Sequence, residues 1–495
     1  MATMEEQVAS QIKREGAKKY LQQDYDKLRQ ECLARNRLFR DPEFPADINS
    51  LGGDEGKYSF IKDIVWKRPT TLCSKPKFIH HGATRTDICQ GELGDCWLLA
   101  AIASLTLDKD ILARVVPSDQ SFTKDYVGIF HFQFWQFGEW VDVVIDDRLP
   151  TRDGKLLFVH SAEGDEFWSA LLEKAYAKLN GCYDALKGGC TIEASEDFTG
   201  GIGEVYKLGK DKAPPNLFKI MTKALERGSL MGCSIAVSGS SEEYTSLNLV
   251  KGHAYSVTGC EEVHFRGKPV QLVHLRNPWG HKEWTGPWSD SSREWKYVNA
   301  EEKLRLDNTA EDGEFWMAYS DFLDQYTNLE ICNLTPDTLT TDGVSRWSHY
   351  QYKGEWKVGS TAGGCRNNTD TFFTNPQFLL RLENVDDEPL DGEDGCTFLV
   401  GLMQKGGRRK HQTGEKLDTI GFSIYKYKGQ SKTHLRPEDL VWQKDVNFLR
   451  SREVSERFRL PPGKYVIIPS TYKPNKNGEF LLRVFSEKHV KTRMI

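Results

Sequence analysis

The apolar run CWLLAAIASL, residues 96–105, constrains the fold more than any other feature of the sequence. A helix that is apolar on every face lies inside a protein core or a membrane. No stretch of the sequence reaches the ~18 consecutive apolar residues that a membrane span needs. We therefore expect a buried helix that begins at Cys96, directly after Gly94 and Asp95.

The patterns around this run predict a mixed α and β unit. Residues 128–150 alternate with period two on both sides of Phe137 and Gly138, which indicates a β-hairpin. The glycine-rich stretch at residues 198–204 predicts a boundary, and a hinge, because helix and strand patterns restart beyond it. A second helix is predicted by FWSALLEKAYAKLNG, with an apolar stripe of Trp168, Leu171, Leu172, Ala175, Tyr176 and Leu179.

At 495 residues the chain is too long for one hydrophobic core, since cores stop growing at roughly 250–300 residues. From about residue 337 the pattern changes to short alternating runs between Gly, Pro and Asp turns, which predicts an antiparallel β-sandwich. Residues 4 to about 36 are charged, with apolar positions at near-helical spacing. They predict either a helix docked on the core or a removable regulatory segment.

Charge and cysteine usage narrow the function classes. A net charge of -5 gives no basic footprint, so we expect no nucleic-acid partner. The eleven cysteines include no C-x-x-C pair, which argues against a disulfide framework or structural zinc and fits a reducing compartment. The first residues resemble neither a signal peptide nor a myristoylation site, so we expect a cytoplasmic protein.

Cys96 stands where a thiol becomes nucleophilic. The unpaired N–H groups and the dipole of a helix N-terminus favour the thiolate, which is the species that attacks an acyl carbon. The same N–H groups, with the side-chain amide of Gln90, are placed to stabilise the oxyanion that forms from the carbonyl. The sequence Gly-Asp-Cys-Trp, which ends at Trp97, resembles the Gly-x-Cys-Trp elbow of papain-like proteases.

A histidine and an asparagine follow in the order that such proteases use. His253 lies 157 residues after Cys96, and Asn277 lies 24 residues later. The segment between them predicts two strands around an Arg-Gly-Lys turn, with His253 opening the first strand and Asn277 closing the second. Both residues are therefore expected at one sheet edge, with His253 as base and Asn277 as the group that orients its ring.

Six motifs together resemble the catalytic core of the calpains: QGELGDCWLLAAIASL, EDFTGG, KGHAYSVTG, RNPWG, WTGPWSD and DGEFWM. The sequences of these motifs are similar to those of digestive-tract calpains. The resemblance implies an α+β fold, in which a papain-like cysteine protease core of two subdomains precedes an antiparallel β-sandwich of the C2-like kind. It implies an N-terminal anchor-helix region (1–35), a nucleophile subdomain (36–200), a His/Asn subdomain (201–335), the C2-like domain (336–487) and a tail (488–495).

The resemblance also implies roles for individual residues. Cys96, His253 and Asn277 form the triad, and Gln90 is the oxyanion donor. Trp279 is the wedge that separates the two half-sites without calcium, and Trp97 and Arg85 stand beside the triad as gating or supporting residues. Arg85 is a candidate ion-pair partner of Glu314.

Two Ca²⁺ sites are implied in the protease core, each ordering a loop beside the triad. We expect Cys96 and His253 to lie beyond hydrogen-bond reach when calcium is absent. Oxygen donors suit this ion. The first site uses Asp87 and Glu166 with the backbone of His80 and Gly82, and the second uses Glu283, Asp290, Asp312 and Glu314 with the backbone of Ala310.

The implied activity is calcium-activated, limited cleavage of protein substrates inside the cell. An inhibitor protein of the calpastatin kind is an implied partner. Conventional calpain large subunits continue into a penta-EF-hand domain, whereas this sequence has no EF-hand loop before Ile495, so we do not expect pairing with a small EF-hand subunit. An acidic loop at 386–394 and basic residues at 405–410 are either solvated loops or a calcium-sensitive contact with the core or anionic lipid, which would bring the protein to membranes.

Two other functions fit parts of the sequence. A Cys-His-Asp acyl transferase of the transglutaminase type also responds to calcium, but Asn277 and the Gln90 elbow argue against it. A catalytically silent scaffold that binds calcium or membranes is the second alternative, and the intact catalytic positions argue against that.

Overall fold

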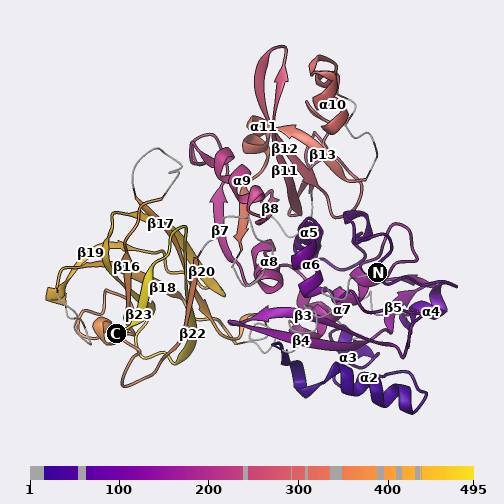
Figure 1. The fold of residues 1–495 in the computed structure, drawn as a ribbon, viewed down its shortest axis with the longest axis horizontal. Coiled ribbons are helices and arrows are strands. Elements are labelled where there is room, and N and C mark those ends of the chain that lie inside the picture. The colour runs from indigo at the N-terminus through magenta and orange to yellow at the C-terminus, as the bar shows by residue number, and fades with distance from the viewer. Residues whose placement is uncertain are drawn as a thin grey trace. The chain divides into compact units, whose positions relative to one another are not determined.

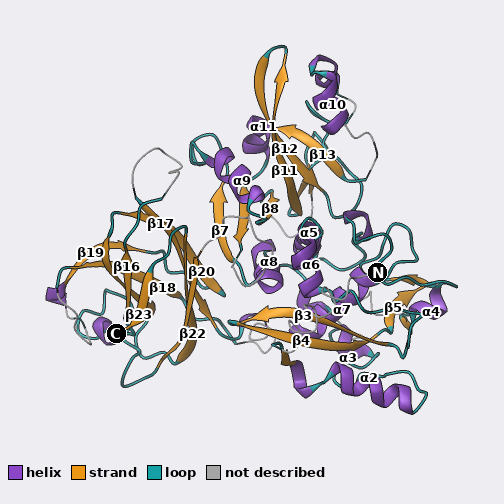
Figure 2. Ribbon diagram, viewed as in Figure 1, coloured by secondary structure: helices purple, strands orange, loops and turns teal. Residues whose placement is uncertain are grey.

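The structure is a computed structural model in which two compact units are formed, Met1–Gly200 with Val205–Asn333 and Gly201–Glu204 with Leu334–Ile495. Figures 1 and 2 trace the chain through both units. The described residues are 16–53, 63–237, 243–290, 292–306, 310, 312–334, 348–386, 395–408, 415–429, 435 and 437–495.

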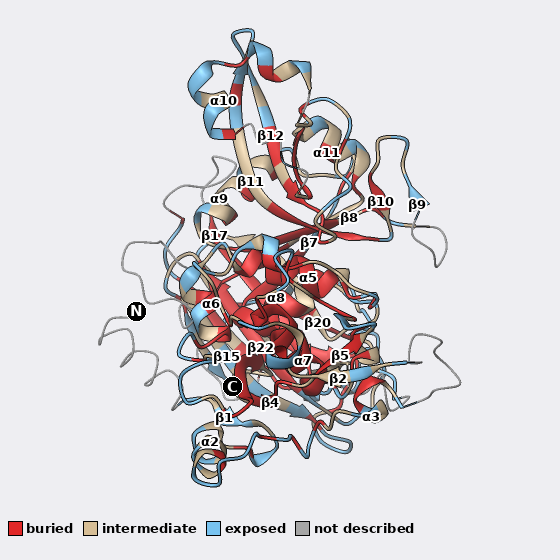
Figure 3. Ribbon diagram, turned by 90° about the vertical axis from the view of Figure 1, so that its right-hand side faces the viewer, coloured by how far each residue is buried: buried red, intermediate tan, exposed pale blue. Residues whose placement is uncertain are grey.

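The predicted buried helix is confirmed as α5, which spans Cys96–Leu105. Every residue of α5 after Cys96 is buried, and Figure 3 shows it among the most buried elements. Its Ala and Leu residues favour a helix and bring no polar group into the core. It packs against α8 (Thr191–Thr199) and against strands of the following sheet.

The second predicted helix is α7, Trp168–Asn180, and it is buried along its whole length. The predicted stripe is therefore only part of its buried surface. The polar residues enter the core because each finds a partner there: Lys174 Nζ lies 2.7 Å from Asp146 Oδ1, and Lys178 Nζ lies 2.6 Å from Asp41 Oδ2. Burial of an ammonium group is tolerated when such a partner is present.

The predicted hairpin consists of β3 (Ile129–Gln136) and β4 (Glu139–Asp146). Phe137 and Gly138 have φ values of 48° and 87°, as a two-residue hairpin turn requires. Helix α2 (Tyr25–Ala34) packs on this hairpin through Cys32. The earlier part of the predicted N-terminal helix, residues 4–15, lies outside the described residues.

The remaining elements of this half are short: β1 (Lys18–Lys19), η1 (Tyr20–Gln22), α3 (Ile48–Leu51), β2 (Val65–Lys67), α4 (Pro69–Leu72), η3 (Arg85–Asp87), α6 (Lys109–Val115), β5 (Leu149–Arg152), β6 (Lys155–Leu156) and η4 (Asp184–Leu186). β1 adds to the hairpin to make the order β1-β4-β3, and β2, β5 and β6 form a second small sheet.

A six-stranded sheet of order β13-β12-β11-β8-β14-β7 follows. Its strands are β7 (Ile202–Lys207), β8 (Leu230–Ser234), β11 (Ala254–Phe265), β12 (Lys268–Arg276), β13 (Glu314–Ala318) and β14 (Asn328–Asn333). The predicted pair around the turn is β11 and β12, so His253 directly precedes one strand and Asn277 directly follows its neighbour. Around this sheet lie α9 (Leu217–Glu226), β9 (Glu243–Tyr244), β10 (Val250–Lys251), η5 (Arg293–Tyr297), α10 (Ala300–Leu306) and α11 (Tyr319–Gln325).

The second unit is the predicted antiparallel β-sandwich. One sheet has the order β15-β22-β17-β20 and the other β19-β18-β21-β16-β23, and their facing side chains form a core that includes Trp356, Phe398 and Phe480. The elements are β15 (Ser348–Trp356), η7 (Phe372–Thr374), β16 (Phe378–Leu382), β17 (Cys396–Gln404), β18 (Ile420–Tyr427), η8 (Pro437–Asp439), β19 (Leu440–Asp445), β20 (Glu453–Leu460), β21 (Gly463–Thr471), β22 (Gly478–Ser486) and β23 (Lys491–Met494).

The segment Gly201–Glu204 belongs to this second unit although it precedes the sandwich by some 130 residues. Arg483 Nη1 donates to the Gly201 carbonyl at 2.6 Å, and Arg457 forms two bonds to the Glu204 carboxylate at 2.7 and 2.8 Å. Ile202 is fully buried against Leu399 and Phe485.

Within the described residues, every helix falls short of the length and apolarity needed to traverse a lipid bilayer.

The buried ion pair of Arg483 and Glu453 gives a prediction about stability. The Arg483 side chain is 0% exposed and that of Glu453 is 6% exposed. Arg483→Met is expected to lower the free energy of unfolding of the second unit by about 3–5 kcal/mol, because a buried carboxylate loses its cation. Calorimetric unfolding of the full chain measures this.

The matched control is Lys405→Met, which removes a cation from the exposed pair of Lys405 and Glu479, whose side chains are 54% and 57% exposed. We expect a change below about 1 kcal/mol, since water already solvates both charges. Equal losses in the two variants would contradict the role given to burial.

Candidate active site

Cys96 is held at the first turn of α5 by contacts on both sides. Trp97 Nε1 donates to the Leu186 carbonyl at 2.8 Å, and the Gly188 N–H donates to the Gly94 carbonyl at 2.9 Å. Cys96 itself is partly exposed, unlike the rest of the helix. The thiol therefore reaches the surface at the positive end of the helix dipole, where an anion is favoured.

The loop before Cys96 fits only because one residue lacks a side chain. A Cβ on Gly91 would stand 2.3 Å from the Phe158 carbonyl oxygen, closer than any real contact. Next to it, the Gln90 N–H donates to the Pro278 carbonyl at 3.2 Å. This bond joins the loop before α5 to the segment that follows β12. Gln90 Nε2 donates to the Leu93 carbonyl at 2.8 Å, so the amide predicted to meet an oxyanion is occupied within its own loop.

His253 and Asn277 lie together at the end of the β11–β12 pair. His253 Nε2 is 2.8 Å from Asn277 Oδ1, and both residues are buried. Asn277 is fixed in turn, since its Nδ2 donates to the Lys282 carbonyl at 3.0 Å. Trp279 covers this contact, with its ring centroid 4.5 Å from that of His253, and its N–H donates to Asn277 Oδ1 at 3.1 Å.

Asn277 accepts on Oδ1 and anchors itself through Nδ2, so its orientation is set by the bonds on both ends of the amide. An acceptor at this position favours the tautomer of His253 that carries its proton on Nε2. Among the described residues, no hydrogen bond joins the Cys96 thiol to His253 Nδ1.

Arg85 and Glu314 form the ion pair that the resemblance implied. Arg85 Nη2 donates to Glu314 Oε2 at 3.0 Å, and Arg85 Nε contacts the other oxygen. Arg276 Nε lies 3.8 Å from the same carboxylate. Nearby, burial followed by the charge of Arg85 lowers the pKa of His274 to about 4, so this histidine is neutral at pH 7. Glu314 thus connects residues that precede α5 with residues of the six-stranded sheet.

The first predicted calcium group lies around η3. Asp87 Oδ2 accepts from the Thr84 N–H at 2.6 Å and from Trp168 Nε1 at 3.2 Å, while Glu166 Oε1 accepts from the His80 N–H at 2.9 Å. Burial, helped by the charges of Asp87 and two further carboxylates, raises the pKa of Glu166 to about 7. Gly82 has φ 97° in the same loop, with open space around its Cα.

The second predicted group lies beyond Asn277. Glu283 Oε1 accepts from the Gly313 N–H at 2.8 Å, and burial followed by the charge of Asp312 raises the pKa of Glu283. Asp312 Oδ1 accepts from the Glu314 N–H at 3.0 Å, and the Asp312 N–H donates to the Ala310 carbonyl at 2.9 Å. Glu283 and Asp290 also line a cavity of about 670 Å³.

These groups fit calcium in the chemistry of their donors. Carboxylate and carbonyl oxygens are the ligands that Ca²⁺ takes, and in both groups neighbouring carboxylates repel each other, which a cation would relieve. No three His, Cys, Asp or Glu side chains among the described residues are gathered closely enough to hold a metal ion.

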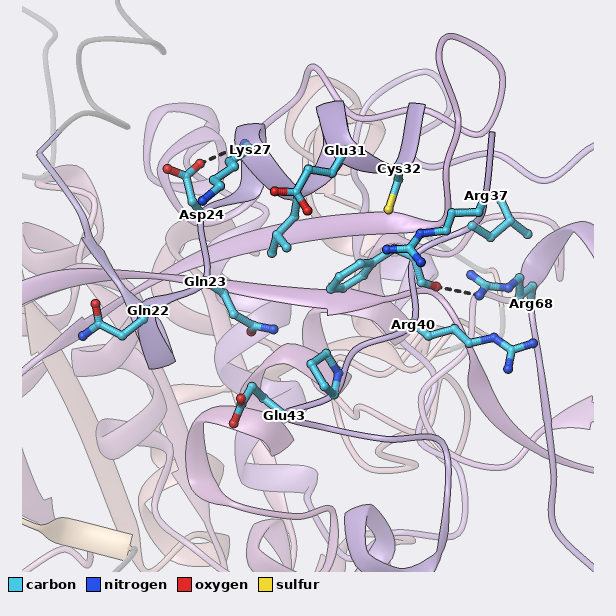
Figure 4. Close-up of a pocket in the computed structure, with 14 residues that line it drawn as sticks. Gln22, Gln23, Asp24, Lys27, Glu31, Cys32, Arg37, Arg40, Glu43 and Arg68 are labelled. Atoms are coloured by element: carbon cyan, nitrogen blue, oxygen red, sulfur yellow. Dashed lines mark hydrogen bonds between the residues drawn. The ribbon is translucent and has the colours of Figure 1, made fainter. Parts of the chain in front are cut away.

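The cavity of about 800 Å³ shown in Figure 4 lies elsewhere, between α2 and residues 37–43. Its wall mixes acidic and basic side chains, and the Arg68 guanidinium at its rim donates to the Phe39 carbonyl at 2.7 Å. None of the predicted catalytic or calcium residues lines it.

Sequence reasoning missed two carboxyl groups behind Cys96. Asp95 and Glu173 are 0% and 1% exposed, and their two carboxyl groups lie close enough to shift each other's pKa. Glu173 falls between the apolar positions of the α7 pattern and so looked like a solvent-facing residue. The one available signal was that Asp95, in an N-cap position, precedes a helix with no exposed face.

Comparisons with known proteins show the family of the chain. The family model described as calpain family cysteine protease matches residues 39–333, and that of calpain large subunit, domain III, matches residues 352–485. The calpain-2 catalytic subunit of Gallus gallus is 60% identical over 488 residues, which cover 96% of this chain and 69% of that protein.

Other relatives give the same result. The calpain-2 catalytic subunit of Homo sapiens is 59% identical over 482 residues, covering 95% of this chain and 69% of that protein. Calpain-8 of Rattus norvegicus is 56% identical over 491 residues, covering 96% and 70%. The chain belongs to the calpain family of calcium-dependent cysteine endopeptidases.

Proposed function

We propose that the chain cleaves peptide bonds with Cys96 as nucleophile, His253 as base and acid, and Asn277 as the orienter of the imidazole. The observation that carries this proposal is the 2.8 Å contact between His253 Nε2 and Asn277 Oδ1, buried beneath Trp279. A packed histidine with a purely structural role has no need of an asparagine that is itself anchored at both ends. The partly exposed Cys96 at a helix N-terminus supplies the matching nucleophile.

In the first half of the reaction, the Cys96 thiolate attacks the carbonyl carbon of the scissile bond. The negative charge on the carbonyl oxygen is met by N–H groups at the start of α5 and by Gln90, whose amide exchanges its bond to Leu93 for one to the oxyanion. The imidazolium of His253 then gives its proton to the departing amine. A thioester and a new N-terminus result.

In the second half, neutral His253 takes a proton from water, and the hydroxide attacks the thioester carbon. Collapse of the tetrahedral intermediate releases the carboxyl product and returns the thiolate and imidazolium. Asn277 keeps the ring in one orientation through both proton transfers, because its Oδ1 holds Nε2–H throughout.

We assign calcium to two groups in the first unit. The first group is Asp87 and Glu166 with the backbone of His80 and Gly82. The second group is Glu283, Asp290, Asp312 and Glu314 with the backbone of Ala310. When bound, the ion neutralises carboxylates that otherwise repel each other, and so orders the loops that carry them. Glu314 is also the partner of Arg85. Ordering of this carboxylate therefore acts on the connection between the two halves that carry Cys96 and His253.

We infer an intracellular, cytoplasmic setting, protein substrates and an inhibitor protein of the calpastatin kind as partners. A lipid contact through the second unit has weaker support. Lys405, one of its expected cations, is paired with Glu479. Residues 387–394 of the acidic loop, and Arg409 and Lys410, lie outside the described residues.

The central prediction concerns casein cleavage across a calcium titration. Cleavage is expected to rise with calcium, to stop on addition of a chelator, and to fall at least about 1000-fold in Cys96→Ser, because a serine hydroxyl is a poor nucleophile in a site built for a thiolate. Cleavage is followed without added amine acceptor, so that a transferase would register as inactive. Activity that survives the chelator or the serine variant would overturn the assignment.

A second prediction isolates the orienting residue. Asn277→Ala is expected to lower kcat about 100-fold with KM changed by less than about 3-fold, because the imidazole remains present but loses its fixed tautomer and orientation. Asn328→Ala is the matched control, since the Asn328 amide accepts from the exposed Lys207 at 2.7 Å and donates to Ser234 Oγ at 3.4 Å, and neither partner is a predicted catalytic residue. A kcat in Asn277→Ala equal to that of the control would show that Asn277 does not serve His253.

A further inference from the structure

Two buried carboxyl groups lie directly behind the nucleophile and take no part in the reaction described above. Asp95 is the residue before Cys96, at the N-cap of α5, and Glu173 lies in the middle of α7. They are 0% and 1% exposed. This depth of burial is unusual for acidic residues without a cation, and neither carboxyl has an ion-pair partner among the described residues.

The hydrogen bonds around the pair show that it must contain a proton. Asp95 does not cap α5 with its side chain, as an N-cap Asp ordinarily does. Neither of its oxygens accepts a bond from an amide or hydroxyl of another described residue. The side chain that acts on Asp95 is the Glu173 carboxyl, and two carboxyl groups form a hydrogen bond only when one of them is protonated.

Glu173 is the member of the pair that keeps the proton. The Val159 N–H donates to both oxygens of its carboxyl group, at 3.2 and 3.4 Å. Burial, and then the charge of Asp95, raise the pKa of Glu173 well above its ordinary value. Burial raises the pKa of Asp95 to about 7, while the bond from Glu173 opposes this rise. Asp95 therefore changes its charge in the neutral range, whereas Glu173 remains an acid.

The other titratable groups around the pair do not change charge in this range. Tyr183 is fully buried, and its pKa is raised well above 10 by burial and by the charges of Glu173, Asp146 and Asp95. Asp146 is ion-paired with Lys174 and Arg148, which hold its pKa far below the ordinary value against the effect of burial. These groups thus present a constant field to Asp95 between pH 6 and pH 8.

The N-terminus of α5 can stabilise only about one negative charge, since its dipole is equivalent to roughly half a positive charge. Both the Asp95 carboxylate and the Cys96 thiolate draw on it. Resting on the proposed role of Cys96 as nucleophile, we propose that Asp95 and Glu173 share one proton behind the first turn of α5, and that this pair positions Cys96 and sets the pH range of its reactivity.

When the pair is neutral, the helix terminus is available to the thiolate alone. When Asp95 ionises, a buried negative charge stands one residue away and disfavours the thiolate. We therefore measure the rate at which iodoacetamide alkylates Cys96 in calcium-loaded protein as a function of pH. Besides the inflection from ionisation of the thiol, a second inflection is expected near pH 7. Above it, the rate should rise less steeply with pH than ionisation of the thiol alone predicts.

The double variant Asp95→Asn/Glu173→Gln tests this, because amides keep the shape and the hydrogen bond but carry no charge. We expect the inflection to disappear and alkylation above pH 7.5 to become about 3- to 10-fold faster than in the wild type. A profile that superimposes on the wild-type profile would overturn the proposal.

Two single variants test the proton on Glu173. Glu173→Gln is a permanent donor to Asp95 and is expected to retain the inflection, whereas Glu173→Leu removes the donor and is expected to move it to higher pH. Identical profiles for Gln and Leu would overturn the shared proton.

The matched control is Glu330→Gln. Glu330, in β14, is another buried glutamate whose pKa is raised by burial. Its carboxylate accepts from the Ile192 N–H at 3.1 Å. Its variant is expected to leave the Cys96 profile unchanged, and loss of the inflection there would overturn a specific role for the pair. Casein cleavage that survives in Cys96→Ser would refute the proposed function instead, so the two failures are distinguishable.

Discussion

A helix buried along its whole length, with only its first residue at the surface, is the constraint on which the first unit depends. The free N–H groups at its start need acceptors or an anion, because bulk water does not reach the rest of the helix. Contacts of the surrounding loop hold this terminus in place. Gly91 lets the chain pass close to the Phe158 carbonyl, and the Trp97 indole N–H donates a hydrogen bond to the Leu186 carbonyl. The Cys96 thiol lies at the helix N-terminus, where a negative charge is favoured.

The fold class and the main elements could be predicted because their patterns are local. An apolar run gives α5, period-two alternation gives β3 and β4, and the turn at Arg266 and Gly267 fixes β11 against β12. His253 and Asn277 come together for the same reason: each adjoins one strand of a hairpin, so their spacing along the chain determines their meeting. The residue boundaries of the predicted domains remain a prediction.

Long-range polar pairing could not be predicted. Lys178 meets Asp41 across 137 residues of sequence, and Arg85 meets Glu314 across 229. A charged residue on a helix ordinarily belongs to the solvent face, and only a partner brought in by the tertiary fold permits its burial. The two groups proposed to bind calcium have the same difficulty, since they lie in loops, and no periodicity in the sequence predicts which loops meet. The pairing of Arg85 with Glu314 was expected from the family resemblance alone, and the calcium ligands, expected on the same ground, remain a prediction.

The assignment of Gly201–Glu204 to the sandwich unit means that the two units are not separable by a single cut in the gene. A fragment that ended at Asn333 would retain Ile202 but lose Leu399 and Phe485, which cover it, together with the arginine that binds Glu204. The sandwich expressed alone would lack Ile202, against which Leu399 and Phe485 pack. Evolutionary exchange of the sandwich between relatives would therefore require matched side chains at Ile202 and Glu204, in the middle of the protease sequence.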